Sequence, residues 1–265
     1  MKPLISLITP TYNVKDFVQG GINSILDQSL DQKYFEWVLL DDGSSDGTDR
    51  VIKDAVRKMD FVSFFSRNKN LGTSKTRNQA ISLSRGQYLA FLDMDDLLET
   101  NALESMLNIM ESEERIKFSY SMHKRIDSDG KFICNRGGIP FSREKLLHFN
   151  FVGALKCVDR DIHNQIGGFD ESFFRYSEDY DYILRVSEVL EDGQIIQNPK
   201  YLYKYRMHGN NNMNNFEKMR ENACLAIKNS LKRKEGLDVE VFWDHKKGLY
   251  NFYNWRKNET TRDTK

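Results

Sequence analysis

The sequence is poor in cysteine and has no long hydrophobic run. Its three cysteines, Cys134, Cys157 and Cys224, lie far apart among 265 residues and lack the spacing of metal ligands. We therefore expect neither a disulfide framework nor a cysteine metal site. No apolar run in the sequence approaches the roughly 20 residues that span a bilayer. These absences predict a cytoplasmic protein with free thiols.

The sequence also lacks an excess of either charge. Lysine plus arginine and aspartate plus glutamate both number 39. Without a net charge there is no global field to attract nucleic acid, so we do not expect nucleic acid as a partner. The chain contains neither a Walker phosphate loop nor a G-x-G-x-x-G motif. If it binds a nucleotide, a metal ion and scattered cations must neutralise the diphosphate.

Four short apolar segments alternate with helical patterns in the N-terminal part of the chain. These segments are Leu4–Thr9, Trp37–Leu40, Phe61–Phe65 and Tyr88–Leu92. Each interval between them has an apolar period typical of a helix. Alternating strands and helices build a parallel sheet covered by helices, with ligands bound beyond the carboxyl ends of the strands. We therefore predict a β-α-β-α-β-α-β unit.

Polar residues follow each of the four predicted strands. They lie in the segments Thr9–Asn13, Asp41–Gly47, Asn68–Gly72 and Asp93–Asp96. Because the carboxyl ends of parallel strands meet at one edge of a sheet, four loops that are distant in sequence should bring their polar groups together. This arrangement predicts a ligand site at that edge.

The last of these segments is the most informative, because an apolar strand ends there in three carboxylates, Asp93, Asp95 and Asp96. Carboxylates this close repel one another unless a hard cation neutralises them. Side chains of a strand alternate between faces, so Asp93 and Asp95 should point the same way while Met94 turns into the core. We predict a divalent metal ion. The alternative is a strand that turns into a helix capped by Asp96.

Other loop residues also have two interpretations. Asp41 and Asp42 form either a turn with a helix N-cap or a pair of acceptors for a base and ribose hydroxyls. Tyr12 is either a core aromatic or, beside Pro10, a ring that stacks on a nucleobase. Arg77 is either a solvated charge at a helix start or a ligand for phosphate.

Taken in order, the motifs P-T-Y-N, D-D-G-S-S-D-G-T, N-x-G-x-x-x-x-R-N and F-L-D-M-D-D resemble the inverting family 2 glycosyltransferases of the GT-A fold. The resemblance continues in Gly167–Glu171, Ser177–Tyr182 and Tyr205–His208 and covers roughly residues 4–212. It implies an α/β protein whose Rossmann-like N-terminal half carries a mixed central sheet flanked by helices. The chain departs from the family pattern at Met94 and in the asparagine-rich segment after His208.

The resemblance implies a role for each matching residue. The implied donor-binding residues are Pro10, Tyr12, Asp41, Asp42, Arg77 and Asp93. The implied ligands of Mn²⁺ or Mg²⁺ are Asp95 and His208. The implied catalytic base is Asp179, and the implied acceptor residues are Gly168, Phe169 and Glu178. The plainer interpretation of the acids near Asp179 is an acidic first turn of a helix.

The chemistry of these residues agrees with the resemblance. A metal ion stabilises a departing nucleotide diphosphate, and a carboxylate on the opposite face takes the proton of an acceptor hydroxyl. We predict a metal-dependent inverting glycosyltransferase that uses a UDP-sugar and a glycan or lipid-linked acceptor in the synthesis of cell-surface polysaccharide or glycoconjugate. One alternative is a nucleotide-sugar-binding module without turnover. Another is a haloacid dehalogenase-type phosphatase, although Gly-Thr or Gly-Val usually follows the aspartate pair there.

The remaining segment, residues 213–265, has a different pattern. Asn214–Lys234 has the spacing of an amphipathic helix, and a second aromatic segment runs from Val241 to Trp255. We therefore divide the chain into a catalytic domain, residues 1–212, and a C-terminal helical extension, residues 213–265. We expect the extension to pack on the core. Its aromatic and basic residues are also typical of an interfacial helix, so peripheral contact with the inner face of a membrane is the alternative.

Overall fold

A nine-stranded mixed sheet lies at the centre of the computed structural model, which describes residues 2–174, 176–191, 193–209 and 215–253. Its strands are β1 (Ile5–Thr11), β2 (Phe35–Asp41), β3 (Val62–Ser66), β4 (Tyr88–Phe91), β5 (Leu97–Leu98), β6 (Phe118–Ile126), β7 (Phe132–Arg136), β8 (Lys156–Asp159) and β9 (Ile195–Arg206). The strand order is β3-β2-β1-β4-β8-β6-β9-β5, and β7 pairs with β6.

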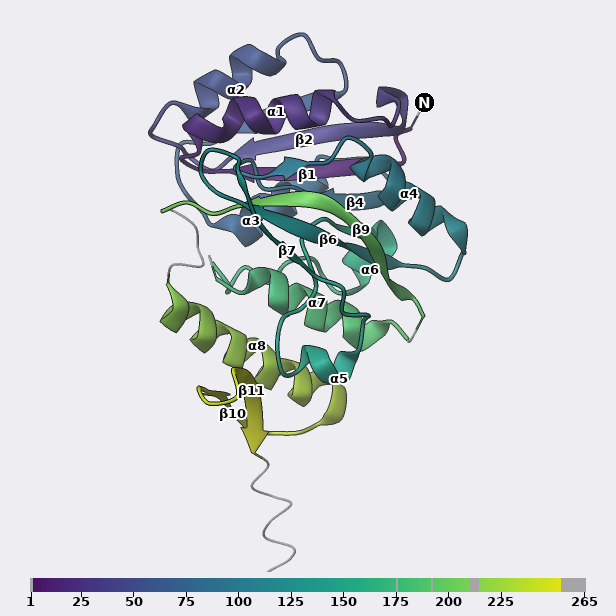
Figure 1. The fold of residues 1–265 in the computed structure, drawn as a ribbon, viewed down its shortest axis with the longest axis vertical. Helices are drawn as coiled ribbons and strands as arrows, with labels where there is room; N and C mark the ends of the chain where they lie inside the picture. Colours follow the sequence, from purple (N-terminus) through teal and green to yellow (C-terminus); the bar gives the residue numbers. More distant parts are fainter. Residues whose placement is uncertain (1, 175, 192, 210–214, 254–265) are drawn as a thin grey trace, which may run out of the picture.

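Helices cover both faces of this sheet. They are α1 (Val18–Leu26), α2 (Thr48–Val56), α3 (Thr73–Ser82), α4 (Ala102–Ser112), α5 (Arg143–Leu146), α6 (Arg160–Gln165), α7 (Glu178–Val189) and α8 (Phe216–Glu235), with short 3-10 helices η1 (Lys15–Phe17) and η2 (Gln32–Tyr34). Figure 1 shows α1, α2 and α4 on one face of the sheet and α3, α6 and α7 on the other, with α5 and α8 beyond α7.

The N-terminal half forms the predicted parallel unit. Strand β1 runs parallel to both β2 and β4, and β2 runs parallel to β3. Every residue of β2 is buried, as expected for a parallel strand covered on both faces. The predicted strand and helix alternation is therefore confirmed. Loops that follow β1, β2 and β4 meet at one edge of the sheet.

The other half of the sheet is largely antiparallel. Strand β8 runs antiparallel to β4 and β6, whereas β6 runs parallel to β9. This pairing confirms the mixed sheet that the resemblance implies. It also places β6 and β9 beside the predicted parallel unit, so their side chains approach the ends of the first four strands.

Two hydrophobic clusters hold the layers together, one on each face. The first packs α1 and α4 against the sheet through residues such as Ile22 and Met106. The second packs α3 and α7 against it and includes Ile227 and Leu231 of α8. A fully buried aliphatic side chain contributes roughly 1.5–3 kcal/mol, so α8 is bound firmly to the core.

The C-terminal extension is helical only in its first part. Helix α8 matches the predicted amphipathic helix, but a helix in the second aromatic segment is a wrong prediction. Residues there form an antiparallel hairpin of β10 (Glu240–Asp244) and β11 (Leu249–Tyr253). The physical reason is a period of two, because Val241 and Trp243 are half-buried while Phe242 between them is exposed. We call residues 215–253 the C-terminal unit.

Some predictions about this region concern residues outside the described ranges. The predicted domain boundary at residue 212 and the aromatic residue Trp255 both fall there. In the part of the chain that the structure describes, no helix has both the length and the apolar character needed to cross a membrane.

Candidate active site

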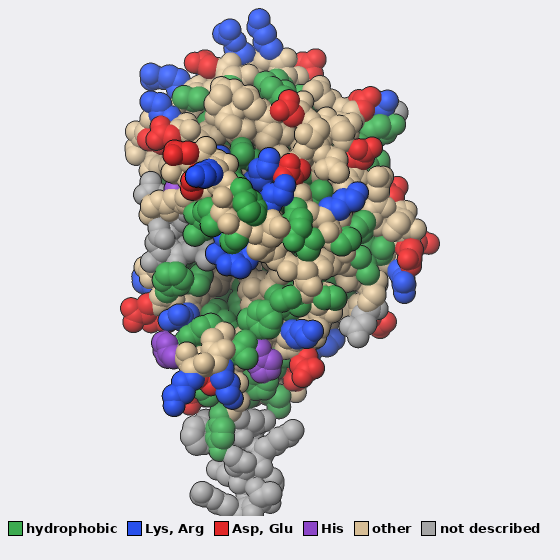
Figure 2. Space-filling model, viewed as in Figure 1, with side chains coloured by type: hydrophobic (Ala, Val, Ile, Leu, Met, Phe, Trp, Pro, Cys, Tyr) green, Lys and Arg blue, Asp and Glu red, His purple; other side chains and the backbone are tan. Residues whose placement is uncertain are grey.

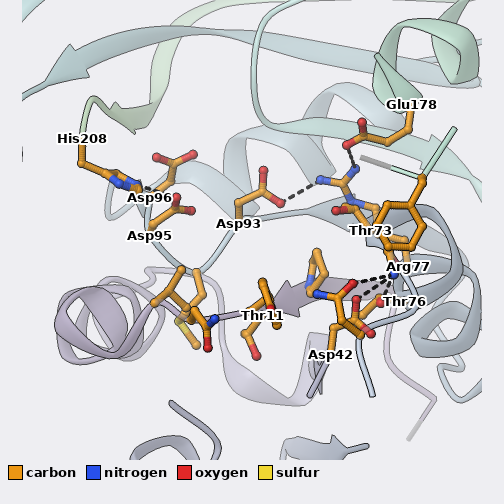
Figure 3. A pocket seen from close by; sticks show the side chains of 18 of the residues that line it. Thr11, Asp42, Thr73, Thr76, Arg77, Asp93, Asp95, Asp96, Glu178 and His208 are labelled. Atoms are coloured by element: carbon orange, nitrogen blue, oxygen red, sulfur yellow. Dashed lines mark hydrogen bonds and ion pairs between the residues drawn. The ribbon is translucent and has the colours of Figure 1, made fainter. Parts of the chain in front are cut away.

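A cavity of about 430 Å³ lies at the carboxyl ends of β1, β2 and β4, and we call it the first cavity (Figure 3). The loops that follow these strands line it, together with α3 and the chain after β9. The sequence-predicted residues among its lining are Pro10, Tyr12, Asp42, Arg77, Asp93, Asp95, Glu178 and His208. The fold thus brings together side chains from loops that are far apart in the sequence.

Arg77 of α3 is the centre of an ion triad. Its side chain is buried, and its two terminal nitrogens donate hydrogen bonds to Asp93 Oδ1 at 2.7 Å and to Glu178 Oε1 at 3.0 Å. Burial alone would lower the pKa of Arg77, but the charges of Asp93 and Glu178 raise it above its ordinary value. This triad, which we call the Arg77 triad, joins the end of β4 to the start of α7.

Asp95 and His208 form the second polar pair of the first cavity. His208 Nε2 lies 2.9 Å from Asp95 Oδ2, and the Phe17 ring packs on the imidazole with 4.6 Å between ring centroids. Figure 3 shows this pair on one side of Asp93 and Arg77 on the other. The fold therefore places both residues that the resemblance assigns to metal binding at one point of the cavity.

This pair has the chemistry of a partial metal site. Within the described ranges, no three His, Cys, Asp or Glu side chains converge to form a metal site. Carboxylate oxygens suit Mn²⁺ and Mg²⁺, and a neutral imidazole is a common metal ligand. Mg²⁺ at nucleotide sites typically takes one or two protein ligands and completes its shell with phosphate oxygens and water. Asp95 and His208 fit a metal ion of this kind.

Asp96 has a structural role that differs from the helix cap considered above. Its carboxylate is buried and accepts hydrogen bonds from Tyr203 Oη at 2.7 Å and from the Arg206 backbone N–H at 2.6 Å. Burial first, and then the two neighbouring aspartates, raise the pKa of Asp96 well above its ordinary value. The cap interpretation is wrong, because the next helix begins at Ala102. Asp96 instead ties the aspartate loop to β9.

Asp42 organises the loop that follows β3. Its two oxygens each accept a backbone hydrogen bond of 2.9 Å, from the N–H groups of Leu71 and Gly72. Each carboxylate oxygen can accept more than one hydrogen bond, so Asp42 can still bind a ligand. Gly72 has φ of 92°, and a Cβ there would lie 2.6 Å from the Phe174 carbonyl oxygen. Only glycine lets these two segments of the cavity wall approach so closely.

Asp41 lies behind the first cavity rather than in its lining. It is 1% exposed, and its carboxylate accepts hydrogen bonds from Thr11 Oγ1 and from the Ser44 backbone N–H, both at 2.9 Å. In this arrangement Asp41 joins β1 to the loop after β2. Donor binding by Asp41 stays a prediction from the resemblance.

A second cavity, of about 470 Å³, lies on the other side of the Arg77 triad. Arg77, Asp93 and Glu178 line both cavities. The second cavity is bounded by β6, β8, the start of α7 and the C-terminal unit. Of the predicted site residues, it adds Asp179 and Phe169. The two cavities therefore meet at the triad.

The acids in the first turn of α7 have different surroundings. Asp179 keeps 40% of its side chain exposed, and Lys156 Nζ of β8 lies 3.4 Å from its Oδ2. Asp181 is fully buried and accepts a hydrogen bond of 2.8 Å from Arg185 Nε. Burial raises the pKa of Asp181 in spite of Arg185. Asp179 faces the second cavity, whereas Asp181 stabilises the packing of its helix.

The side chain of Glu178 changes its charge near neutral pH. Burial raises its pKa to about 7, although the charge of Arg77 acts in the opposite direction and that of Asp179 raises it further. Because the same carboxylate accepts a hydrogen bond from Arg77, its ionisation is tied to the Arg77 triad.

The predicted acceptor residues Gly168 and Phe169 lie at different depths. Phe169 lines the second cavity, stacks on Tyr182 with 4.2 Å between ring centroids and lies under the Arg77 guanidinium at 5.4 Å. Gly168 does not line either cavity. It has φ of 77°, and a Cβ there would lie 2.9 Å from Asn78 Oδ1. Gly168 therefore supports the position of Phe169 from behind.

Sequence reasoning missed several residues of the second cavity. They are Lys156 on β8, His123 and Arg125 on β6, Tyr176 before α7 and Trp243 on β10. Four of them lie outside any motif, and Tyr176 precedes the segment Ser177–Tyr182 without being part of it. The one available signal was the alternation along β6, which places His123 and Arg125 on the same face.

Comparison with protein families gives a clear result. The model of the family described as Glycosyl transferase family 2 matches residues 6–169, which is more than half of the chain. A chondroitin synthase of Escherichia coli is 31% identical over 87% of this chain, and this chain spans 33% of that protein's length. TuaG of Bacillus subtilis, a putative teichuronic acid biosynthesis glycosyltransferase, is 32% identical over 62% of this chain and 66% of its own.

Solved structures agree on the fold. S. aureus TarS residues 1–349, in complex with UDP-GlcNAc, superposes with a TM-score of 0.71 at 19% identity and covers 89% of this chain and 68% of its own. The mannosyltransferase PcManGT of Pyrobaculum calidifontis, in complex with GDP-Man and Mn²⁺, gives 0.67 at 15% identity, covering 88% of this chain and 65% of its own. The GT-A fold expected from the sequence is confirmed.

Proposed function

The chain belongs to glycosyltransferase family 2, and on that premise we propose that it moves a sugar from a UDP-sugar to a hydroxyl of a glycan or lipid-linked acceptor, with inversion of the anomeric carbon. The observation that carries the proposal is the pair of cavities that meet at the Arg77 triad. A donor in the first cavity and an acceptor in the second would bring their reacting atoms together there.

The first cavity has the lining that a nucleotide sugar requires. Tyr12 is 36% exposed at its margin and offers a ring face to a nucleobase, beside the carboxylate of Asp42. Arg77 and Asp93 lie deeper, where they would meet the diphosphate and the sugar. The UDP-GlcNAc in the TarS structure supports a uridine nucleotide as the donor. A cavity of about 430 Å³ is within the usual size of a small-ligand site.

Asp95 and His208 are the residues that would hold Mn²⁺ or Mg²⁺. When bound, such an ion neutralises charge that develops on a departing diphosphate. The Mn²⁺ in the PcManGT complex supports this assignment. His208 is held in place by Phe17 and by its contact with Asp95, so both ligands are already positioned in the protein.

Asp179 is the group that we assign as catalytic base. Its carboxylate takes the proton of the acceptor hydroxyl while the hydroxyl oxygen forms a bond to the anomeric carbon. At the same time, the bond between that carbon and the diphosphate oxygen breaks, and the nucleoside diphosphate leaves. One displacement inverts the configuration. Lys156 orients Asp179 through its contact at 3.4 Å, and the Arg77 triad positions the neighbouring backbone.

A donor screen tests this proposal. We expect release of UDP from a UDP-sugar in the presence of Mn²⁺ and an acceptor, and loss of release in excess chelator. The anomeric configuration of the product, measured by NMR coupling constants, should be opposite to that of the donor. Undiminished transfer in excess chelator would contradict the metal requirement, and a product that retains the configuration would contradict the single displacement.

We further propose that the protein acts in the cytoplasm and that its C-terminal unit contacts the inner face of a membrane. Phe216, Leu225 and Phe242 are 53%, 47% and 47% exposed on this unit. Figure 2 shows hydrophobic and basic side chains side by side over the C-terminal part of the molecule. Such a mixture favours an anionic lipid surface.

A further inference from the structure

The second cavity contains a cation without a carboxylate partner. Arg125 lines this cavity from β6, and its Nε is buried without a hydrogen-bond partner among the residues that the structure describes. Throughout the described ranges, no carboxylate forms an ion pair with it. Arg125 as a whole is half-buried, but its Nε is withdrawn from water. A buried polar atom without a partner is costly, so its presence in a cavity indicates a ligand that supplies the missing hydrogen bond and charge.

The acids around this cavity are already satisfied by other partners. Asp93 and Glu178 both accept hydrogen bonds from Arg77. Asp179 is in contact with Lys156. Asp96, the remaining carboxylate in the lining, accepts hydrogen bonds with both of its oxygens, from Tyr203 and from the backbone of Arg206. Arg125 is therefore the charge that remains without a match.

The two faces of β6 differ in whether their cations have a carboxylate partner. Lys124 points to the opposite face, where Glu99 accepts a hydrogen bond from it at 2.8 Å and pairs with Lys204 of β9 at 3.2 Å. The fold thus supplies a carboxylate for the cations of that face. On the cavity face it supplies none for Arg125.

His123 shares the cavity face of β6 with Arg125. Its Nδ1 is likewise buried without a partner in the described part of the chain. Burial first, and then the charges of Arg125, Lys156 and Arg136, lower the pKa of His123 to about 4, so the imidazole is neutral. It offers a polar nitrogen beside the guanidinium rather than a second charge.

Aromatic side chains complete the lining. Tyr176 and Trp243 line the cavity, and the Trp243 ring is fixed by Tyr250, with 4.8 Å between ring centroids, and by the Arg220 guanidinium at 4.8 Å. Pockets that combine aromatic surface with a few directed polar groups are typical of small-molecule sites. Here the aromatic surface suits a sugar ring, and Arg125 adds an anion-binding group.

We propose, resting on the proposed function, that the acceptor carries an anionic group, a carboxylate or a phosphate, and that Arg125 binds this group in the second cavity. The planar guanidinium donates in a fork that matches two oxygens of either anion. The anion would lie beside the sugar that stacks on Trp243, with the reacting hydroxyl directed to Asp179. Arg125 is then a residue that determines specificity for the acceptor.

The test compares three probes by NMR titration of the protein with UDP and the diamagnetic ion Mg²⁺ present: glucuronate, glucose 6-phosphate and glucose. We expect both acidic sugars to bind about tenfold or more tightly than glucose, because charge-assisted hydrogen bonds are the stronger ones. Arg125→Gln should remove this preference, and Arg125→Lys should restore part of it. The matched control is Arg136→Gln, which changes an exposed arginine on the neighbouring strand that does not line the cavity.

The titration identifies the anionic group that Arg125 binds, or contradicts the proposal. A stronger response to glucuronate assigns the anion as a carboxylate, and a stronger response to glucose 6-phosphate assigns it as a phosphate. Equal binding of acidic and neutral probes, or no binding of either acidic sugar at millimolar concentration, would overturn the proposal. UDP affinity is measured in the same samples. A protein that binds UDP but does not prefer anions contradicts this inference alone, whereas failure to bind UDP contradicts the proposed function.

Discussion

The two cavities that meet at the Arg77 triad differ in how their polar groups are held. In the first cavity, Asp42 and Asp95 already have partners within the protein. In the second cavity, Arg125 and His123 have buried nitrogens for which the described residues provide no partner. The first cavity is thus organised before a ligand arrives, as expected for a nucleotide-sugar site. The second leaves a charge that an anionic acceptor would satisfy under the proposal above.

Of the substitutions that distinguish the two cavities, Asp179→Asn should have the largest effect on sugar transfer. This change keeps the size of the side chain but removes the proton acceptor, and general-base action is typically worth about 10²- to 10⁴-fold. Transfer should fall by that factor, measured as the rate of UDP release with saturating donor. Glu171→Gln, at an exposed acid outside both cavities, is the control. If Asp179→Asn transfers at nearly the parent rate, another group is the base.

A smaller effect is expected from Trp243→Ala, which removes aromatic surface from the second cavity. We expect KM for the acceptor to rise by about fivefold to tenfold while KM for the donor is unchanged, because the ring contributes stacking and burial to the acceptor alone. Phe132→Ala is the control, since Phe132 is an exposed aromatic residue of β7 that lines neither cavity. An increase confined to the donor KM would contradict the assignment of Trp243 to acceptor binding.

The triad between the cavities gives a prediction about pH. Glu178 has an ordinary pKa of 4.5 that is raised to about 7 in the folded protein. Between these values the folded protein keeps a proton that the unfolded chain loses, so the free energy of unfolding falls as pH rises through this window. Urea denaturation at both ends of the window should show a fall of roughly 3 kcal/mol. Glu178→Gln should remove it, and an unchanged slope would contradict the assignment.

The smallest expected effect concerns the outer surface of the C-terminal unit, away from both cavities. Replacing Phe242 and Tyr253, which are 47% and 40% exposed, by serine should reduce cosedimentation with phosphatidylserine vesicles by about tenfold or less. Thermal unfolding should be unchanged, because neither side chain is buried. Equal sedimentation of parent and variant would leave core packing as the function of this unit.

The sequence predicted the first cavity well because its residues follow strands in recognisable order. Asp42, Asp95 and His208 each lie in a motif, and the parallel pairing of β1, β2 and β4 brings the first loops to one edge. Local patterns and topology agree there, so the position of a residue in the chain indicates its position in space.

The second cavity could not be predicted in the same way. Arg125, Lys156 and Trp243 come from β6, β8 and β10, and they meet only through antiparallel pairing and through the packing of the C-terminal unit. No local pattern encodes those contacts. The hairpin also escaped prediction, because a short aromatic segment fits a strand or a helix until its alternation is set against a neighbouring surface.

The most direct test of the account is calorimetric affinity for UDP in the presence of Mn²⁺, measured for Asp95→Ala and Asp179→Asn side by side. Asp95 lies in the first cavity and Asp179 in the second. We predict that Asp95→Ala weakens UDP binding by about tenfold or more, because a hard oxygen ligand is lost, while Asp179→Asn binds UDP like the parent. Unchanged affinity in Asp95→Ala, or an equal loss in both variants, would contradict the division of the site into donor and acceptor cavities.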